Sequence, residues 1–248
     1  MPNVRVPIRV LAVLILGSSA VVSVPHARAS GASIVPAIVE HGRKPLVRAC
    51  ADCHLTSGLG RPDSSSLAGL PADYLAHQMA DFRRGLRRSS DPRTDAMTAV
   101  AGAVEERDVV EASEYFASLT PRPWITVVER PIGAKPAGEP IVEVPAKPAP
   151  GFVASVPGGA LERGEFLVEA GGAGRTVRCA NCHGGDLRGT GAIPGIAGRS
   201  PSYMARQLND MRRGVRHGVG ADRMMGTVAR ITEDDVVAIA AYAASLAP

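Results

Sequence analysis

The sequence predicts an all-α chain of two tandem small helical domains joined by a long, proline-rich, extended linker. This fold class rests on three observations: a duplication over most of the chain, helix start and stop signals at matching places in both copies, and nine of the twenty prolines gathered in residues 120–160. We expect a signal peptide over 1–29, a first domain over 30–120, a linker over 121–158 and a second domain over 159–248.

The N-terminal residues have the pattern of a secretory signal. Arg5 and Arg9 precede the apolar stretch 10–16, and Ala27-Arg28-Ala29 is a small-x-small cleavage site. We expect cleavage after Ala29 and no stable membrane insertion afterwards, because the apolar run is shorter than the ~20 residues of a membrane-spanning helix. An uncleaved anchor is the alternative.

The basic charge of the chain belongs largely to this segment. Removing residues 1–29 removes three arginines and no acids, so the formal net charge of +4 falls to +1. A nucleic-acid partner, which would require a strongly basic surface, is not expected. The remaining arginine clusters, around Arg87 and Arg216, are predicted to lie on solvated helix faces.

The two copies are related by a shift of 129 residues. This shift places Cys50 on Cys179, and it places "LAGLPADYLAHQMADFRRGLR" on "IAGRSPSYMARQLNDMRRGVR". After a deletion of two residues in the second copy, "RDVVEASEYFASL" lies on "DDVVAIAAYAASL" with a shift of 127. The chain is therefore a tandem duplication, and each copy can be compared with the other.

The helices of each copy are marked by their ends. Proline near the start and glycine after the end predict helices from about Pro71 to Gly85 and from Pro201 to Gly214. A last helix is expected over 105–119 and over 232–247, where Thr232 and the acids after it suit a helix N-terminus. A shorter helix is expected over 161–170, and a poorer one before the first motif because of Pro36.

The proline-rich segment is expected to run extended over the surface, since proline fixes φ and removes a hydrogen-bond donor. Short strands are predicted at 124–128 and 141–144. The single tryptophan, Trp124, is expected to pack against one of the domains.

All four cysteines belong to two copies of one motif, "CADCH" at 50–54 and "CANCH" at 179–183. Only 4% of the residues are aromatic, so two small domains would need a bulky group to complete their cores. A C-x-x-C pair followed directly by histidine is typical of covalent haem attachment, with two thiols for the vinyl groups and an imidazole for the iron. We therefore expect two covalently attached haem c groups, held by Cys50, Cys53 and His54 and by Cys179, Cys182 and His183.

Three other uses of the cysteines remain as alternatives. Four thiolates could share one zinc ion, each pair could be a redox-active dithiol, or each pair could form a structural disulfide. Each motif carries its own histidine in its own helical copy, and this arrangement favours haem.

The duplication also selects the second iron ligand of each site. Met97 lies on Met224, each seven residues before an apolar residue that opens the last helix, whereas the other methionines exchange with different apolar residues. We predict Met97 and Met224 as the axial ligands, with Met225 as a competitor for the second site. The remaining histidines have no histidine partner in the other copy and are expected to be solvated or removed with the signal: His26, His41, His77 and His217.

On these motifs, the chain resembles the two-domain di-haem class I c-type cytochromes. The resemblance implies two class I cytochrome c domains, each a small helical domain around a covalent haem. It implies that first and last helices cross, bringing Gly164 and Phe166 close to Tyr242. It also implies that a carbonyl after CxxCH holds the histidine ring, a role for which Pro194 fits.

The first copy departs from this family pattern at two places. Ser65 stands where the second copy has Pro194, and Leu55 stands where it has Gly184. A serine carbonyl can accept the same bond, so we expect ligation to survive with a looser loop. The two haems are therefore predicted to differ in potential and stability.

The resemblance implies an electron-transfer protein and not an enzyme, with no catalytic residues. We expect a periplasmic shuttle, or a cytochrome subunit that accepts electrons from a dehydrogenase and passes them toward a terminal oxidase; other cytochromes are also candidate partners. The alternative is a di-haem peroxidase with one openable iron. Six recurring residues are expected to bond the haem propionates, or else simply to pack or to face solvent: Tyr74, Gln78, Arg87, Tyr203, Gln207 and Arg216.

Overall fold

The computed structural model describes residues 34–131 and 151–248, and Ile34–Pro248 forms one compact unit. The predicted signal peptide, its cleavage site after Ala29 and the strand predicted at 141–144 lie outside the described residues. Across the described ranges, no helix is both long and apolar enough to cross a bilayer.

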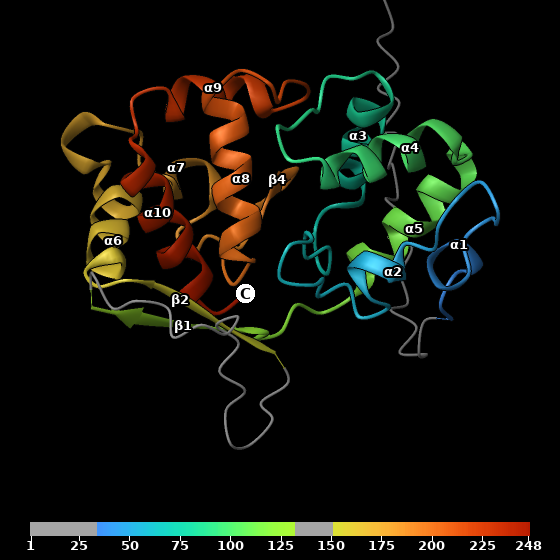
Figure 1. Cartoon of the computed structure of the whole chain (residues 1–248), viewed down its shortest axis with the longest axis horizontal. Helices are drawn as coiled ribbons and strands as arrows, with labels where there is room; N and C mark the ends of the chain where they lie inside the picture. The colour runs from blue at the N-terminus through green and yellow to red at the C-terminus, as the bar shows by residue number, and fades with distance from the viewer. Residues whose placement is uncertain (1–33, 132–150) are drawn as a thin grey trace, which may run out of the picture. The chain divides into compact units, whose positions relative to one another are not determined.

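Helices occur in the same order in the two copies (Figure 1). The first copy contains α1 Ala37–Glu40, α2 Ala51–His54, α3 Ala72–Arg83, α4 Arg93–Ala103 and α5 Glu106–Ser118. The second contains α6 Ala160–Ala170, α7 Ala180–His183, α8 Pro201–Arg212, α9 Ala221–Val228 and α10 Glu233–Ser245, with a 3-10 turn η1 at Gly172–Gly174. The fold is thus helical, as predicted.

The helix ends follow the expected signals. Helix α8 begins at Pro201, and α3 and α8 are followed by Gly85 and Gly214 with φ of 68° and 67°, a left-handed conformation that glycine adopts without strain. Helix α10 has a capping box in which Thr232 and Asp235 bond each other's backbone N–H. Helix α1 is only four residues long, which confirms the poorer first helix of the first copy.

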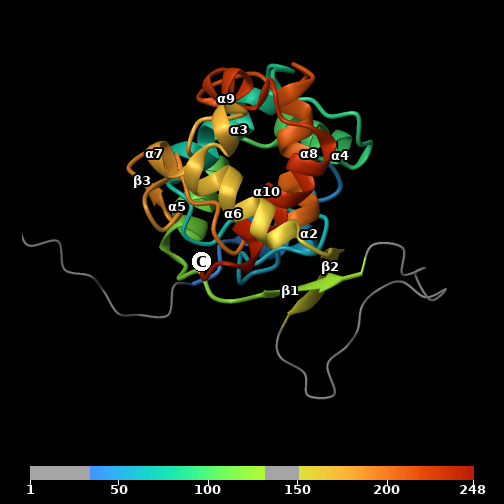
Figure 2. The same cartoon turned by 90° about the vertical axis from the view of Figure 1, so that its left-hand side faces the viewer.

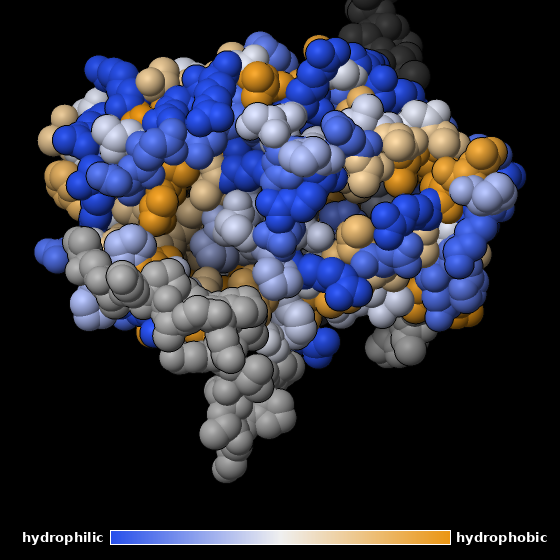
Figure 3. All heavy atoms as spheres, viewed as in Figure 1, coloured by the Kyte–Doolittle hydropathy of each residue, from blue (hydrophilic) through white to orange (hydrophobic). Residues whose placement is uncertain are grey.

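Each copy has its own hydrophobic core. In the second copy, α6 and α10 cross at Gly164, where a Cβ atom would lie 2.6 Å from Tyr242 Cβ. The expected approach of Gly164 to Tyr242 is confirmed, whereas the Phe166 side chain is 53% exposed. On the face shown in Figure 3, hydrophilic residues predominate and hydrophobic ones form small separate patches.

The segment between the copies contains two strands, β1 Ile125–Arg130 and β2 Phe152–Pro157, paired in parallel with Ile125 opposite Phe152. Figures 1 and 2 show them side by side next to α6 and α10, and Val127 and Val156 pack with Ala241 of α10. Strand β1 overlaps the strand predicted at 124–128, whereas β2 was not predicted. Trp124 donates from Nε1 to the Gly60 carbonyl at 3.1 Å, so it packs against the first copy as expected.

A second strand pair, present in the second copy, lies just after its cysteine motif. Strands β3 Gly189–Thr190 and β4 Ile193–Pro194 are antiparallel, with Pro194 opposite Gly189. The equivalent residues of the first copy, 60–65, form turns and irregular backbone instead. The two copies therefore differ in the loop that follows the motif.

Candidate functional site

Each cysteine motif forms one turn of helix. Cys50 is the N-cap of α2 and its carbonyl accepts from His54 N at 2.9 Å; Cys179 and His183 repeat this arrangement in α7. The four thiols are unpaired, and those of Cys50 and Cys179 are largely buried. Neither motif therefore contains a disulfide in this structure.

The two motif histidines are buried and held by a carbonyl. His54 Nδ1 lies 2.8 Å from the Ser65 carbonyl oxygen, and His183 Nδ1 lies 2.8 Å from that of Pro194. Because a carbonyl can only accept, Nδ1 carries the proton and Nε2 keeps its lone pair. Burial lowers the pKa of both imidazoles, which keeps them neutral and able to bind a metal through Nε2.

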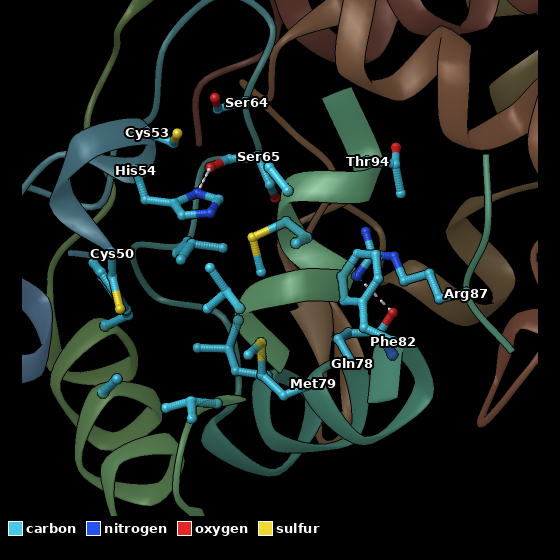
Figure 4. A pocket seen from close by; sticks show the side chains of 18 of the residues that line it. Cys50, Cys53, His54, Ser64, Ser65, Gln78, Met79, Phe82, Arg87 and Thr94 are labelled. Atoms are coloured by element: carbon cyan, nitrogen blue, oxygen red, sulfur yellow. Dashed lines mark hydrogen bonds between the residues drawn. The ribbon is translucent and has the colours of Figure 1, made fainter. Parts of the chain in front are cut away.

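The first motif opens on a cavity of about 370 Å³. Figure 4 shows Cys50, Cys53 and His54 on one side of it and Gln78, Phe82 and Arg87 at the opposite end. Apolar side chains from α3, α4 and α5 line much of the space between, including Leu75, Val100, Val109 and Phe116. A space of this size, apolar with a few polar groups at one end, fits a large planar cofactor with acidic substituents.

The predicted methionines lie near the sites. Met97, on α4, lines the cavity. Met224 and Met225, both on α9, are half-buried and both pack against the second core, so the choice between them stays open. Met204 and Met211 are buried core residues, as expected, and the three described histidines outside the motifs are exposed: His41, His77 and His217.

The arginines Arg87 and Arg216 were expected on solvated helix faces, and this prediction was wrong. They are 8% and 5% exposed and form an antiparallel β-bridge between the copies. Arg87 donates to Gln78 and Gln207 oxygens at 3.0 and 3.1 Å, and Arg216 donates to the same two at 2.9 and 2.8 Å. The cause is the contact between the copies, because each guanidinium is covered by a glutamine and a tyrosine of the other copy.

The tyrosines complete this inter-copy arginine cluster. Arg87 donates to the Tyr203 hydroxyl at 2.6 Å, and Arg216 donates to that of Tyr74 at 3.3 Å. Although burial opposes ionisation, the two guanidinium groups lower the pKa of Tyr203 to about 8. Two adjacent buried cations, bonded to neutral oxygens, create a strong preference for an anion beside them.

The cysteine chemistry does not fit the redox and zinc alternatives. Burial raises the pKa of the Cys50 and Cys179 thiols to about 11, whereas redox-active C-x-x-C motifs have lowered thiol pKa values. Nowhere in the described parts of the chain do three histidine, cysteine or carboxylate side chains converge as metal ligands. The two motifs therefore form separate sites, each with one buried imidazole.

Sequence reasoning missed two further groups around the sites. Asp108 and Asp235 are equivalent buried carboxylates in the first turns of α5 and α10, bonded by Arg43 and by Arg163 and Arg175. Their recurrence under the shift of 127 was a usable signal. Arg199 was also missed, and its equivalent in the first copy is Leu70, so recurrence could not have found it.

Comparison with known proteins identifies the class. The cytochrome c family profile matches residues 162–247. A thiosulfate dehydrogenase electron acceptor of Stutzerimonas stutzeri is 33% identical over 83% of this chain and 82% of its own length. Cytochrome c4 of Azotobacter vinelandii is 27% identical over 78% of this chain and 82% of its own.

Two solved structures share the fold. Thiosulfate dehydrogenase (TsdBA) from Marichromatium purpuratum superposes with a TM-score of 0.63 at 27% identity, covering 86% of this chain and 39% of that longer chain. Reduced recombinant cytochrome c4 from Pseudomonas stutzeri superposes with a TM-score of 0.59 at 23% identity, covering 79% of this chain and 93% of the other.

The fold and the two motif sites define a c-type cytochrome with covalently bound haem c. The chain belongs to the di-haem class I c-type cytochromes, the family of its cytochrome c4 relatives. It is an electron-transfer protein, and the peroxidase alternative has no support among these relatives.

Proposed function

We propose that this cytochrome works in the periplasm, accepting electrons from a dehydrogenase and passing them toward a terminal oxidase. Thiosulfate dehydrogenase is the proposed donor. The S. stutzeri relative, named as an electron acceptor of that enzyme and aligned over more than four fifths of both chains, supports this donor. The signal-like pattern of residues 1–29 supports the location.

The proposal places one haem in each of two tandem domains, 30–120 and 159–248. Cys50, Cys53 and His54 would attach and ligate the first haem, and Cys179, Cys182 and His183 the second. Met97 and Met224 would complete the iron coordination. The observation that carries the proposal is that both buried histidines have Nδ1 bonded to a carbonyl at 2.8 Å, which leaves Nε2 for iron.

When bound, each haem supplies an iron that exchanges one electron between Fe(III) and Fe(II) with little rearrangement. The surrounding residues hold the ligands and exclude water. Phe116 packs edge-on to the His54 ring at 6.5 Å between centroids, and the Ser65 carbonyl accepts from Nδ1 of the imidazole. A fixed imidazole lowers the reorganisation that accompanies each electron exchange.

The inter-copy arginine cluster would receive the haem propionates. Arg87, Gln78 and Tyr74 line the polar end of the first cavity together with Tyr203 and Gln207 from the other copy. Carboxylates placed there would compensate the two buried guanidinium charges. Both haems would thereby approach the boundary between the copies, so that electrons could pass from one site to the other.

The test measures electron acceptance directly. The oxidised holoprotein is mixed with thiosulfate dehydrogenase and thiosulfate, and the rise of the reduced haem absorption is followed by stopped flow. We expect catalytic amounts of the enzyme to reduce both haems, and thiosulfate without enzyme to reduce neither. As a control, a class I cytochrome with a different redox partner is tested in the same way. The proposed donor is wrong if that cytochrome is reduced equally fast and if the reduction rate of this protein does not saturate as its concentration is raised.

A further inference from the structure

The carbonyl that holds each motif histidine is fixed differently in the two copies. In the second copy, Pro194 lies in β4 and pairs with Gly189 of β3, and its ring restricts φ. In the first copy, the Ser65 loop (residues 62–68) has no strand and no proline at the bonding position. A carbonyl in such a loop would be expected to move unless something else holds it.

The second copy supplies what the Ser65 loop lacks. Ser200 and Ser202 both donate to the Pro62 carbonyl, the latter at 2.7 Å. Arg206 donates to the Asp63 carbonyl at 2.9 Å. The loop that was expected to be loose is thus held along its length by residues 199–206, at the start of α8.

Arg199 makes the central contacts. It is 8% exposed, and it donates from Nη1 to the Ser66 carbonyl at 2.9 Å and from Nη2 to the Ala68 carbonyl at 3.2 Å. Its Nε donates to the Gly195 carbonyl of its own copy at 3.2 Å. Ser66 and Gly195 are equivalent under the shift of 129, and each directly follows the carbonyl that accepts from a motif histidine.

One planar guanidinium therefore spans the two histidine-holding loops. A lysine could not reproduce this, because its ammonium is a point donor without the rigid fork of arginine. Arg199 of the second copy contacts the first copy, but the first copy makes no equivalent contact. The position equivalent to Arg199 there is Leu70, a buried core residue.

We propose that Arg199 is a positioning residue for the first haem: it fixes the Ser65 carbonyl through Ser66, and so couples the ligand His54 to the docking of the second copy. The inference rests on the proposed ligation by His54. A bond from Nδ1–H to a well-placed carbonyl makes Nε2 a stronger donor to iron and favours Fe(III). Loss of this placement should favour Fe(II).

The test uses the holoprotein with both haems attached and the variant Arg199→Lys, which keeps the positive charge but lacks the rigid fork of arginine. Because the charge is kept, only the placement of the Ser65 carbonyl changes, and we expect the Fe(II)/Fe(III) ratio of the first haem at fixed potential to rise about threefold, or about 28 mV for a one-electron centre. The second haem should shift less, because β3 and β4 still hold Pro194. Hydrogen exchange should accelerate in residues 62–68 and stay unchanged in α5.

Two further variants frame the result. Arg213→Leu removes an arginine at the C-cap of α8 whose charged partner is Glu233, and it should change neither potential nor exchange. Arg199→Leu, which introduces the residue of the first copy, also removes a buried cation that favours Fe(II), so its first-haem potential should lie below that of Arg199→Lys. The haems are followed separately by NMR during redox titration, with resonances of the first haem identified from the His54→Ala spectrum.

Two results would overturn the proposal. The first is that Arg199→Lys has the same first-haem potential, and the same exchange rate in residues 62–68, as Arg213→Leu. The second is an equal shift of both haems with faster exchange throughout α3 and α5, which would indicate general loosening. Failure of the underlying ligation is distinguishable, because His54→Ala would then retain an unchanged first-haem spectrum.

Discussion

The crossing of α6 and α10 at Gly164 depends on the absence of a side chain. In Gly164→Ala, the new Cβ would lie 2.6 Å from Tyr242 Cβ and would also overlap the Ala238 carbonyl oxygen. Carbon atoms pack at about 3.5–4.0 Å, so the helices must separate by about 1 Å, which forfeits a quarter to a half of the dispersion energy across the contact. We expect a loss of about 2 kcal/mol in the free energy of unfolding.

Gly226→Ala is the matched control. Gly226 is also helical, in α9, but no atom lies within 4 Å of its Cβ position. This substitution should leave the free energy of unfolding unchanged or raise it by up to about 1 kcal/mol, since alanine is the better helix former. Guanidinium unfolding of the holoproteins, followed by far-ultraviolet circular dichroism and by haem absorption, compares the two. Equal midpoints for both variants would refute the crossing argument.

Three further predictions concern individual side chains. Met97→Ala should convert the first haem to a high-spin spectrum, and Met224→Ala should do so for the second; if Met225→Ala does so instead, Met225 is the ligand. Arg87→Gln should make reduction of the first haem less favourable by about 1 kcal/mol, and so lower its reduction potential, because a buried cation favours Fe(II); an unchanged potential in a redox titration would contradict this. Asp235→Asn should cost about 1–2 kcal/mol of unfolding free energy at neutral pH, because the carboxylate is buried but its two arginine partners are about half exposed; equal unfolding midpoints for variant and wild type would contradict a stabilising role of these bonds.

Asp235 also predicts a pH dependence. Burial opposes its ionisation, but hydrogen bonds from Thr232, Arg163 and Arg175 outweigh burial and hold the pKa of the carboxyl below its ordinary value. Its stabilisation is therefore complete above the unfolded pKa of about 3.9 and is lost as pH falls through the lower folded pKa. Acid titration of unfolding should show this loss in the wild type and less of it in Asp235→Asn.

Much of the helical framework could be predicted because the duplication presents each signal twice. The glycines after α3 and α8 and the capping residues at Thr232 act over three or four residues, so local sequence suffices to place them. The motif histidines could be predicted equally well, since the two thiols and the imidazole lie within one helical turn. The predicted acceptors at Ser65 and Pro194 also agree with the structure.

The features that could not be predicted depend on contacts between distant residues. Arg87 and Arg216 lie in arginine-rich runs typical of solvated helix faces, and only their contacts with the other copy bury them. Strand β2 contains strand-favouring residues, Phe152, Val153 and Val156, but the run is short, and its parallel pairing with β1 joins segments more than twenty residues apart in the sequence. Arg199 could not be found by comparing the two copies, because the equivalent position in the first copy is Leu70.

The chain reaches the second copy already at strand β1, before most of the proline-rich segment. This limits the part of that segment that can act as a tether between the copies. Strand β1 already packs on α10, so the stretch that actually tethers the copies is residues 119–124, between the end of α5 and the start of β1. Six residues reach at most about 20 Å. Strand β2 pairs with β1 on the second copy, so the chain leaves and rejoins the same copy between these strands, and the number of residues between them does not set the spacing of the two redox sites. A foreign sequence could be inserted there, such as a domain that captures an electron donor, without altering how electrons cross between the copies.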